Sequence, residues 1–207
     1  PHQLQGLCAF LQLPSCSERL LVRFCSWLLA LSPDLSYASA AVLAEQLFLA
    51  RVQALTQPPS RHLMAALASF CSKYARPFCR ALVAPILREP AAAPEQTKLV
   101  CELVEECLEP EGVRLVLRQV LEAPLSEKAL RVVQAALARQ VRAPRCSLRP
   151  RPRVSSLLTP LLQEELPAEL LELLVLALCQ QAPAFATSLR YAQLVMAVLT
   201  LYQSHVS

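Results

Sequence analysis

The residue types that most often carry out catalysis are few in this chain and lie far apart. The three histidines are His2, His62 and His205, two near the chain ends and one at the expected start of a helix. A histidine triad or metal site needs such side chains to converge. Loops that cradle phosphate need glycine, and Gly6 and Gly112 cannot build a Walker or Rossmann pattern. We therefore expect a protein that is not an enzyme and has no cofactor or metal site.

The chain also has nine cysteines, and none of them forms a Cys-x-x-Cys pair. This spacing is not typical of a zinc site or of a redox motif. Most of the cysteines fall where a helix places a small core residue, as Cys25 does between Phe24 and Leu28. We expect buried, reduced thiols, which indicate a reducing intracellular compartment.

Acidic side chains recur at helical spacing at Glu102, Glu105, Glu106 and Glu109, opposite an apolar stripe from Val100 to Leu108. Such a row is suited to docking a basic partner, and these four residues are candidates for partner binding. The alternative is the solvated back of a packed helix, because helices in stacked pairs routinely present glutamate to water.

Five of the 20 basic residues fall in one short stretch, and the remaining 15 nearly balance the 16 acidic residues of the chain. They are Arg142, Arg145, Arg149, Arg151 and Arg153. Guanidinium groups pair with phosphate or carboxylate, so Arg149, Arg151 and Arg153 are candidates for contact with nucleic acid or an acidic partner. Because prolines alternate with the arginines, residues 142–153 are predicted to be a Pro/Arg-rich loop, alternatively a solvated insertion without a partner.

The aromatic residues mostly coincide with apolar stripes and are expected in the core. They are Phe24, Phe48, Phe70, Tyr74 and Phe78. Trp27 lies off the main stripe of its helix and is a further candidate for anchoring a partner, because exposed tryptophan is enriched among the residues that dominate binding energy.

Composition predicts the elements that position these residues. A hydrophobic content of 55% with only two glycines favours helix over a turn-rich β-fold. The longest uninterrupted apolar run, Leu173 to Cys179, is far shorter than the roughly 18 to 20 residues that span a lipid bilayer, so no membrane contact is expected.

Prolines and capping residues divide the chain into about ten helical segments. Ser36 and Ser126 are expected N-caps, and residues 15–18 have the spacing of a capping box. Glu127 and Arg131 stand one turn apart and are predicted to form an exposed ion pair.

Each predicted helix is apolar over a wide sector that it cannot bury alone, so neighbouring helices must stack. Two helices with their turns recur about every 35 to 45 residues, which is close to the period of HEAT-like repeats. We therefore predict an all-α fold of antiparallel helix pairs stacked as a HEAT-like right-handed solenoid. Residues 1–207 would form a single helical-repeat domain that is a piece of a longer chain.

Two stretches carry a family likeness beyond composition, Trp-Leu-Leu-Ala-Leu-Ser-Pro-Asp-Leu-Ser at residues 27–36 and Ser-Phe-Cys-Ser-Lys-Tyr-Ala-Arg-Pro-Phe-Cys at residues 69–79. Together with Tyr191-Ala192-Gln193-Leu194 and the following turns to Gln203, they resemble the C-terminal domain of the Fanconi anaemia group E family. The insertion around residues 142–166 departs from the family pattern, which also continues with further helices beyond Ser207.

The resemblance implies an antiparallel helical repeat in the nucleus. It implies a non-catalytic adaptor in the Fanconi core complex, a ubiquitin ligase assembly that acts in the repair of DNA interstrand crosslinks. The expected partners are the group C subunit, other core-complex subunits and the D-group protein that the complex monoubiquitinates, the last depending on the helices beyond Ser207. The alternative function is nucleic-acid binding by the helical repeat through the arginine-rich loop.

Overall fold

The structure is a computed structural model that describes residues 2–31, 34–89, 93–142 and 166–206. Within these ranges the chain forms no strand and ten continuous helical segments, as the composition, prolines and capping residues predicted. We call each such segment a rod; a rod includes any π-helical turn within it. Three of the rods contain a π-helical turn between or after α-helical segments. The elements in chain order are α1 (His2–Phe10), the 3-10 turn η1 (Leu13–Ser15), α2 (Glu18–Ala30), α3 (Tyr37–Ala44), η2 (Glu45–Leu49), α4 (Ala50–Gln53), α5 (Arg61–Lys73), α6 (Ala75–Phe78), η3 (Cys79–Val83), α7 (Ala84–Arg88), α8 (Pro94–Glu102), η4 (Leu103–Cys107), α9 (Pro110–Leu121), α10 (Glu127–Arg142), α11 (Ala168–Gln181), the 3-10 turn η6 (Ala182–Phe185) and α12 (Leu189–Val206).

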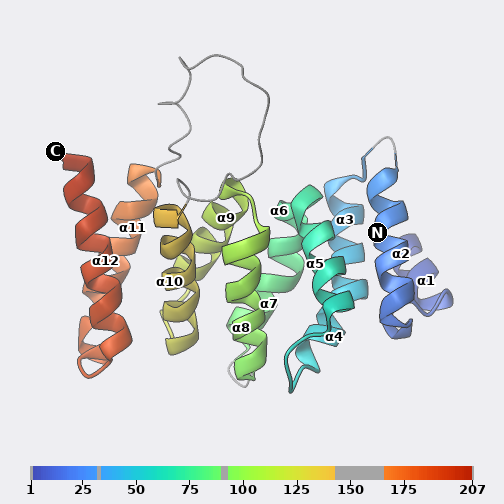
Figure 1. Cartoon of the computed structure of the whole chain (residues 1–207), viewed down its shortest axis with the longest axis horizontal. Helices are drawn as coiled ribbons and strands as arrows, with labels where there is room; N and C mark the ends of the chain where they lie inside the picture. The colour runs from blue at the N-terminus through green and yellow to red at the C-terminus, as the bar shows by residue number, and fades with distance from the viewer. Residues whose placement is uncertain (1, 32–33, 90–92, 143–165, 207) are drawn as a thin grey trace, which may run out of the picture.

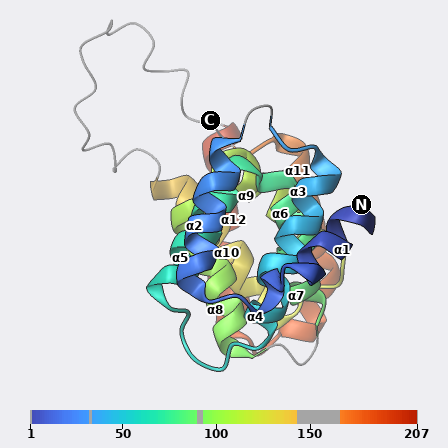
Figure 2. The ribbon, with the colours of Figure 1, turned by 90° about the vertical axis from the view of Figure 1, so that its right-hand side faces the viewer.

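Successive rods alternate between two rows that run along the long axis of the molecule (Figures 1 and 2). In one row α2 packs on α5, α5 contacts η4, and α10 packs on α8 and on α12. In the other row α1 packs on α3, α3 on α6, α7 on α9, and α9 on α11. The first and last rods therefore lie at opposite ends of the molecule, with the core between the two rows.

The core is one continuous cluster of buried side chains that extends from Cys8 to Val198. At its centre Phe48, Phe70 and Phe78 are fully buried. The rings of Phe48 and Phe70 meet edge to face, with centroids 5.5 Å apart and planes 70° apart, a favoured geometry for aromatic pairs. Tyr74 is also buried and Phe24 is half-buried, so the expectation that these aromatic residues pack in the core is confirmed.

Serine side chains begin several of the helices, and the predicted N-caps Ser36 and Ser126 are confirmed. The predicted capping box at residues 15–18 is wrong, because Ser17 and not Ser15 is the N-cap of α2. The hydroxyl oxygens of Ser17, Ser36 and Ser126 accept hydrogen bonds from the backbone N–H groups three residues ahead, at 3.4, 3.2 and 3.2 Å. Each bond satisfies one of the donors that a helix leaves unpaired in its first turn.

Three π-helical turns, η2, η3 and η4, interrupt the α-helical pattern. The turn η3 lies directly before Ala84 and Pro85, and the Ala84 N–H donates to the carbonyl of Cys79, five residues earlier. Proline has no N–H and would leave an α-helical carbonyl unpaired. In the wider π-helical turn the hydrogen bonds shift from four to five residues back just before Pro85, and the rod continues to Arg88.

One window among the described residues, Ala168–Phe185, is long and apolar enough to cross a membrane by length and composition. This window includes Glu169 and Glu172, so it is longer than the uninterrupted apolar run from Leu173 to Cys179. A packed helix passes the same test. Here 22% of the window is buried, and its residues Leu170, Leu171, Leu174 and Leu178 lie in the core.

The predicted Pro/Arg-rich loop at residues 142–153 begins inside α10, which includes Arg142. Residues 143–153 lie outside the described residues, as does the rest of the insertion up to residue 165.

Truncating the central ring should strongly destabilise the stack. Phe70→Ala removes a fully buried ring from contact with Phe48, Tyr74 and Phe78, and we expect a loss of about 3–5 kcal/mol in the free energy of unfolding. Urea unfolding followed by circular dichroism measures it. The matched control is Phe10→Ala, whose ring is 84% exposed and whose loss should change stability by less than about 0.5 kcal/mol. Equal effects of the two substitutions would contradict this description of the core.

Candidate partner-binding surfaces

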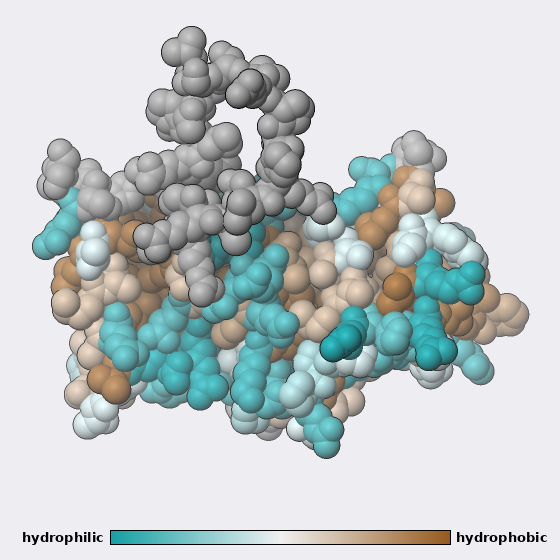
Figure 3. All heavy atoms as spheres, viewed as in Figure 1, coloured by the Kyte–Doolittle hydropathy of each residue, from teal (hydrophilic) through white to brown (hydrophobic). Residues whose placement is uncertain are grey.

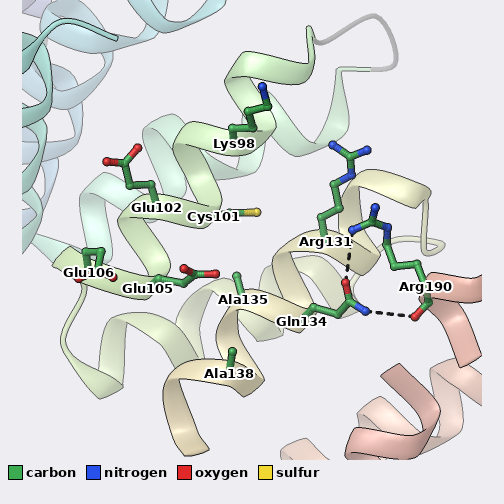
Figure 4. A pocket seen from close by; sticks show the side chains of 10 residues that line it. All are labelled: Lys98, Cys101, Glu102, Glu105, Glu106, Arg131, Gln134, Ala135, Ala138 and Arg190. Carbon is green, nitrogen blue, oxygen red and sulfur yellow. Dashed lines mark hydrogen bonds between the residues drawn. The ribbon is translucent and has the colours of Figure 1, made fainter. Parts of the chain in front are cut away.

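The row that contains α8, α10 and α12 has a groove of about 710 Å³ on its outer side. Three of the four glutamates of the predicted acidic row line it, Glu102 at the end of α8 and Glu105 and Glu106 in η4. In Figure 4 the Cys101 sulfur and the Glu105 carboxylate point toward α10, while Glu102 and Glu106 lie at the outer rim. The acidic row is thus one wall of a hollow between neighbouring rods.

Glu109 does not line the groove, although helical spacing placed it in the same row. The rod ends at Cys107, and the Leu108 N–H donates to the Leu103 carbonyl over 2.9 Å, closing the π-helical turn. Glu109 is the N-cap residue of α9, with an extended backbone, so it leaves the face shared by Glu102, Glu105 and Glu106.

Residues from α10 and α12 form the opposite wall, and spacing within one helix did not predict them as site residues. They are Arg131, Gln134 and Arg190, with Ala135 and Ala138 beside them (Figure 4). Gln134 and Arg190 hold each other, because the Gln134 side-chain nitrogen donates to the Arg190 carbonyl at 3.2 Å and an Arg190 guanidinium nitrogen donates to the Gln134 side-chain oxygen at 3.4 Å. Their roles depend on α12 reaching α10, a contact between helices distant in sequence.

The predicted ion pair between Glu127 and Arg131 does not form in the described part of the chain. Glu127 instead faces Arg190, with 3.8 Å between the Glu127 carboxylate and the Arg190 Nε. The reason is tertiary: α12 packs on α10 and brings a second guanidinium to the carboxylate. The side chain of Arg131 lines the groove without a hydrogen bond or ion pair to any other described residue.

Arg139 of α10 holds the backbone of η4, which carries part of the acidic wall. Its guanidinium donates to the carbonyl oxygens of Val104 and Glu105, at 3.4 Å for Val104. Charge-assisted bonds of this kind are stronger than those between neutral groups. Arg139 therefore fixes the backbone that carries Glu105 relative to α10.

The thiol of Cys101 reports the electrostatics of the groove. Burial raises its pKa from 9.0 to about 11, and the Glu105 carboxylate adds to the rise, while the charges of Arg131 and Arg190 lower the pKa. Carboxylate and guanidinium groups from opposite walls thus act on the same sulfur. The Cys101 thiol stays protonated at neutral pH, which does not suit it to nucleophilic catalysis.

The prediction of buried thiols is confirmed for four of the eight cysteines that the structure describes, which are Cys8, Cys25, Cys71 and Cys79. Cys16, Cys101 and Cys107 are half-buried, and Cys146 lies outside the described residues. Cys179 is exposed on α11 and departs from that prediction, because it faces away from the core.

Trp27 lies on the outer side of α2, and its side chain is 67% exposed. Leu20 lies two turns before it on α2, and Leu31 is the C-cap residue with an extended backbone directly after the helix; each is 49% exposed. Together these three residues form the Trp27 edge, at the α1–α2 end of the molecule. Figure 3 shows hydrophobic side chains at both ends of this face and hydrophilic side chains gathered over α8 and α10 in the middle.

The candidates for nucleic-acid contact, Arg149, Arg151 and Arg153, lie outside the described residues. The prediction that they bind nucleic acid or an acidic partner stays a prediction.

Comparison with known proteins agrees with the likeness seen in the sequence. A family model described as the Fanconi Anaemia group E protein FANCE matches residues 1–148. The human Fanconi anemia group E protein is 42% identical over 208 residues, an alignment that covers 100% of this chain and 34% of the human protein. The chain thus spans about a third of the length of that relative.

The two walls of the groove should change the reactivity of Cys101 in opposite directions. Glu105→Gln removes a charge that raises the Cys101 pKa, so alkylation of this thiol at pH 8 should become about threefold faster. Arg131→Gln removes a charge that lowers the pKa, so alkylation should become slower by a similar factor. Mass spectrometry of the Cys101 peptide after timed iodoacetamide treatment measures both rates.

Glu109→Gln is the matched control, because Glu109 belongs to the same run of glutamates and lies outside the groove. Its Cys101 rate should equal that of the unmodified protein. Changes in the same direction for Glu105→Gln and Arg131→Gln would contradict the arrangement of the walls.

Proposed function

This chain belongs to the Fanconi anaemia group E family, and from that premise we propose that it is a non-catalytic adaptor of the nuclear Fanconi core ubiquitin-ligase complex. In this role it binds the group C subunit, with other core-complex subunits, and presents the D-group substrate for monoubiquitination in the repair of DNA interstrand crosslinks. Family membership supports a role in the Fanconi anaemia pathway, and the particular contacts are the proposal.

The observation that carries the proposal is the Trp27 edge. Monomeric soluble proteins rarely expose large contiguous apolar patches unless a partner covers them, and an exposed tryptophan near exposed leucines supplies the apolar anchor that interfaces use. At the opposite end α11 and α12 expose a second set of apolar side chains, Leu173, Leu176, Met196 and Leu199. Two separated apolar surfaces suit a protein that joins two others.

We further propose that the two rows form a right-handed solenoid of antiparallel helix pairs similar to HEAT repeats, as one domain over residues 1–207. The alternation of successive rods between the rows supports this arrangement, as does the single core from Cys8 to Val198. Stacked repeats of this kind offer long surfaces for binding other proteins. Nucleic-acid binding as the alternative function rests on Arg149, Arg151 and Arg153, and no contact in the described residues favours it.

The Trp27 edge can be tested by removing its anchor. Trp27→Ala should weaken binding of the purified group C subunit at least about tenfold, because truncation of a buried aromatic anchor costs about 2 kcal/mol or more. Surface plasmon resonance with immobilised group C subunit measures the affinity. An unchanged circular dichroism spectrum shows that the helices remain folded.

Met196→Ala serves as the matched control at the other end of the molecule, with a side chain 65% exposed on α12. It should leave the affinity for the group C subunit unchanged. If Trp27→Ala binds like the unmodified chain and Met196→Ala binds more weakly, the group C subunit contacts the α11–α12 end, and the proposed contact at the Trp27 edge is wrong. If neither substitution weakens binding, the apolar edges are not the contact.

A further inference from the structure

The groove between α8, η4, α10 and α12 has facing walls that differ in charge. Glu102, Glu105 and Glu106 line one wall, and Arg131 and Arg190 line the other (Figure 4). The hollow of about 710 Å³ lies within the size range of protein ligand sites, which is about 300–1,000 Å³. It is open along one side, so it suits a segment of chain better than an enclosed small molecule.

The charges that face the groove are only partly neutralised within the chain. Lys98 is paired with Glu95 at 2.5 Å, and Arg190 is engaged by Glu127 and Gln134. Glu127, one helical turn before Arg131, pairs with Arg190 instead of with Arg131. Within the ranges that the structure describes, Arg131 has no ion pair.

The glutamate side chains of the acidic wall also have no partner among the described residues. The side chains of Glu102, Glu105 and Glu106 form no ion pair or hydrogen bond with any part of the chain that the structure describes. Three carboxylates on one wall and one guanidinium on the other are therefore available to an external partner. Complementary charges across an interface fix the register and orientation of the bound partner.

The floor of the groove leaves room for a backbone. Cys101, Ala135 and Ala138 are small, so main-chain atoms can approach the helices between the two charged walls. Side chains of an extended strand point alternately to opposite sides, which matches two facing walls. Side chains of a helix are spread around its axis at 100° steps and match this arrangement less well.

We propose that this groove binds an extended segment of a partner protein in which basic side chains alternate with acidic ones. The basic side chains meet Glu105, with Glu102 and Glu106 at the rim, and an acidic side chain meets Arg131. A nucleic-acid strand does not fit, since its phosphates would face three carboxylates. The inference is independent of the Trp27 edge, which lies at the α1–α2 end of the array.

The decisive comparison uses two labelled decapeptides of equal composition and zero net charge. In the first, lysine and glutamate alternate, so an extended chain carries all its lysines on one side. In the second, five lysines precede five glutamates, so both sides carry both signs. Fluorescence anisotropy with the whole chain at about 50 mM salt, where screening is weak, measures the affinities. We expect the alternating peptide to bind at least about fivefold more tightly, the equivalent of one extra ion pair.

Variants of each wall test whether the binding is in the groove. Glu105→Gln and Arg131→Gln should each weaken binding of the alternating peptide about three- to fivefold. Two matched controls remove the same charges elsewhere, Glu109→Gln outside the groove and Arg80→Gln on the exposed side of η3, and both should bind as the unmodified chain does.

Exchanging one charge between the two walls gives a variant whose result distinguishes a binding role from a structural one. Arg131→Glu alone should weaken binding more than Arg131→Gln does, because it places a carboxylate opposite the acidic wall while Arg190 stays engaged by Glu127 and Gln134. Combined with Glu105→Arg it should recover part of the binding, because an alternating peptide that shifts by one residue presents an acidic side chain at position 105 and a basic one at position 131. Circular dichroism shows whether each variant is folded.

Four results would overturn the proposal. The first three are absence of binding by the alternating peptide, equal binding of the two peptides, and binding that persists unchanged in both single glutamine variants. Tighter binding of an all-lysine decapeptide than of the alternating one would assign the site to a purely basic partner held by the acidic wall, and would also overturn it.

Discussion

The structure depends on one constraint, which is that no single helix can bury the apolar sector that its own sequence creates. On α9 the residues Val113, Val116, Leu117 and Val120 are all buried, and they face neighbours in both rows, because α9 contacts α7, α10 and α11. Burying one such side chain stabilises the fold by about 1.5–3 kcal/mol. Every rod therefore needs neighbours on more than one side, and the two-row array satisfies that need with a single core while leaving its ends open.

Long cationic side chains connect neighbouring rods where backbone carbonyls would otherwise face the gap between them. Lys73 of α5 donates to the Leu29 carbonyl of α2 at 2.8 Å, and Arg51 of α4 donates to the carbonyl of Cys16 at 2.6 Å. Arg139 does the same between α10 and η4. An unpaired carbonyl in such a seam costs about 1–3 kcal/mol, so these bonds stabilise the spacing of the array as well as its helices. The position of the acidic wall follows from one of them.

The sequence predicted what depends on short-range pattern. The number of helices, the serine caps at Ser36 and Ser126 and the burial of Phe70 all follow from spacing and local hydrogen bonding, and all are confirmed. The π-helical turns were not predicted, because an inserted residue barely alters an apolar stripe that is already wide. Glu109 was misplaced for this reason, since the turn η4 ends the rod before it. The close packing at Gly112 was also not predicted. Its lack of a side chain permits a close approach to Leu108 and Ala75, which no local pattern reveals.

The candidate site was harder to predict than the fold because its two walls come from rods that meet only through stacking. Within α10 alone, Glu127 and Arg131 are the natural partners, and the spacing of one turn predicts that they neutralise each other. Once α12 lies beside α10, Arg190 takes the carboxylate, and Arg131 is left without an ion pair among the described residues, on the wall opposite Glu105. Stacking therefore creates the unpaired charge as well as the groove. In an array of stacked rods, the seams between neighbouring rods are where an available charge and an available space arise together, so binding surfaces are expected there even when no sequence motif marks them.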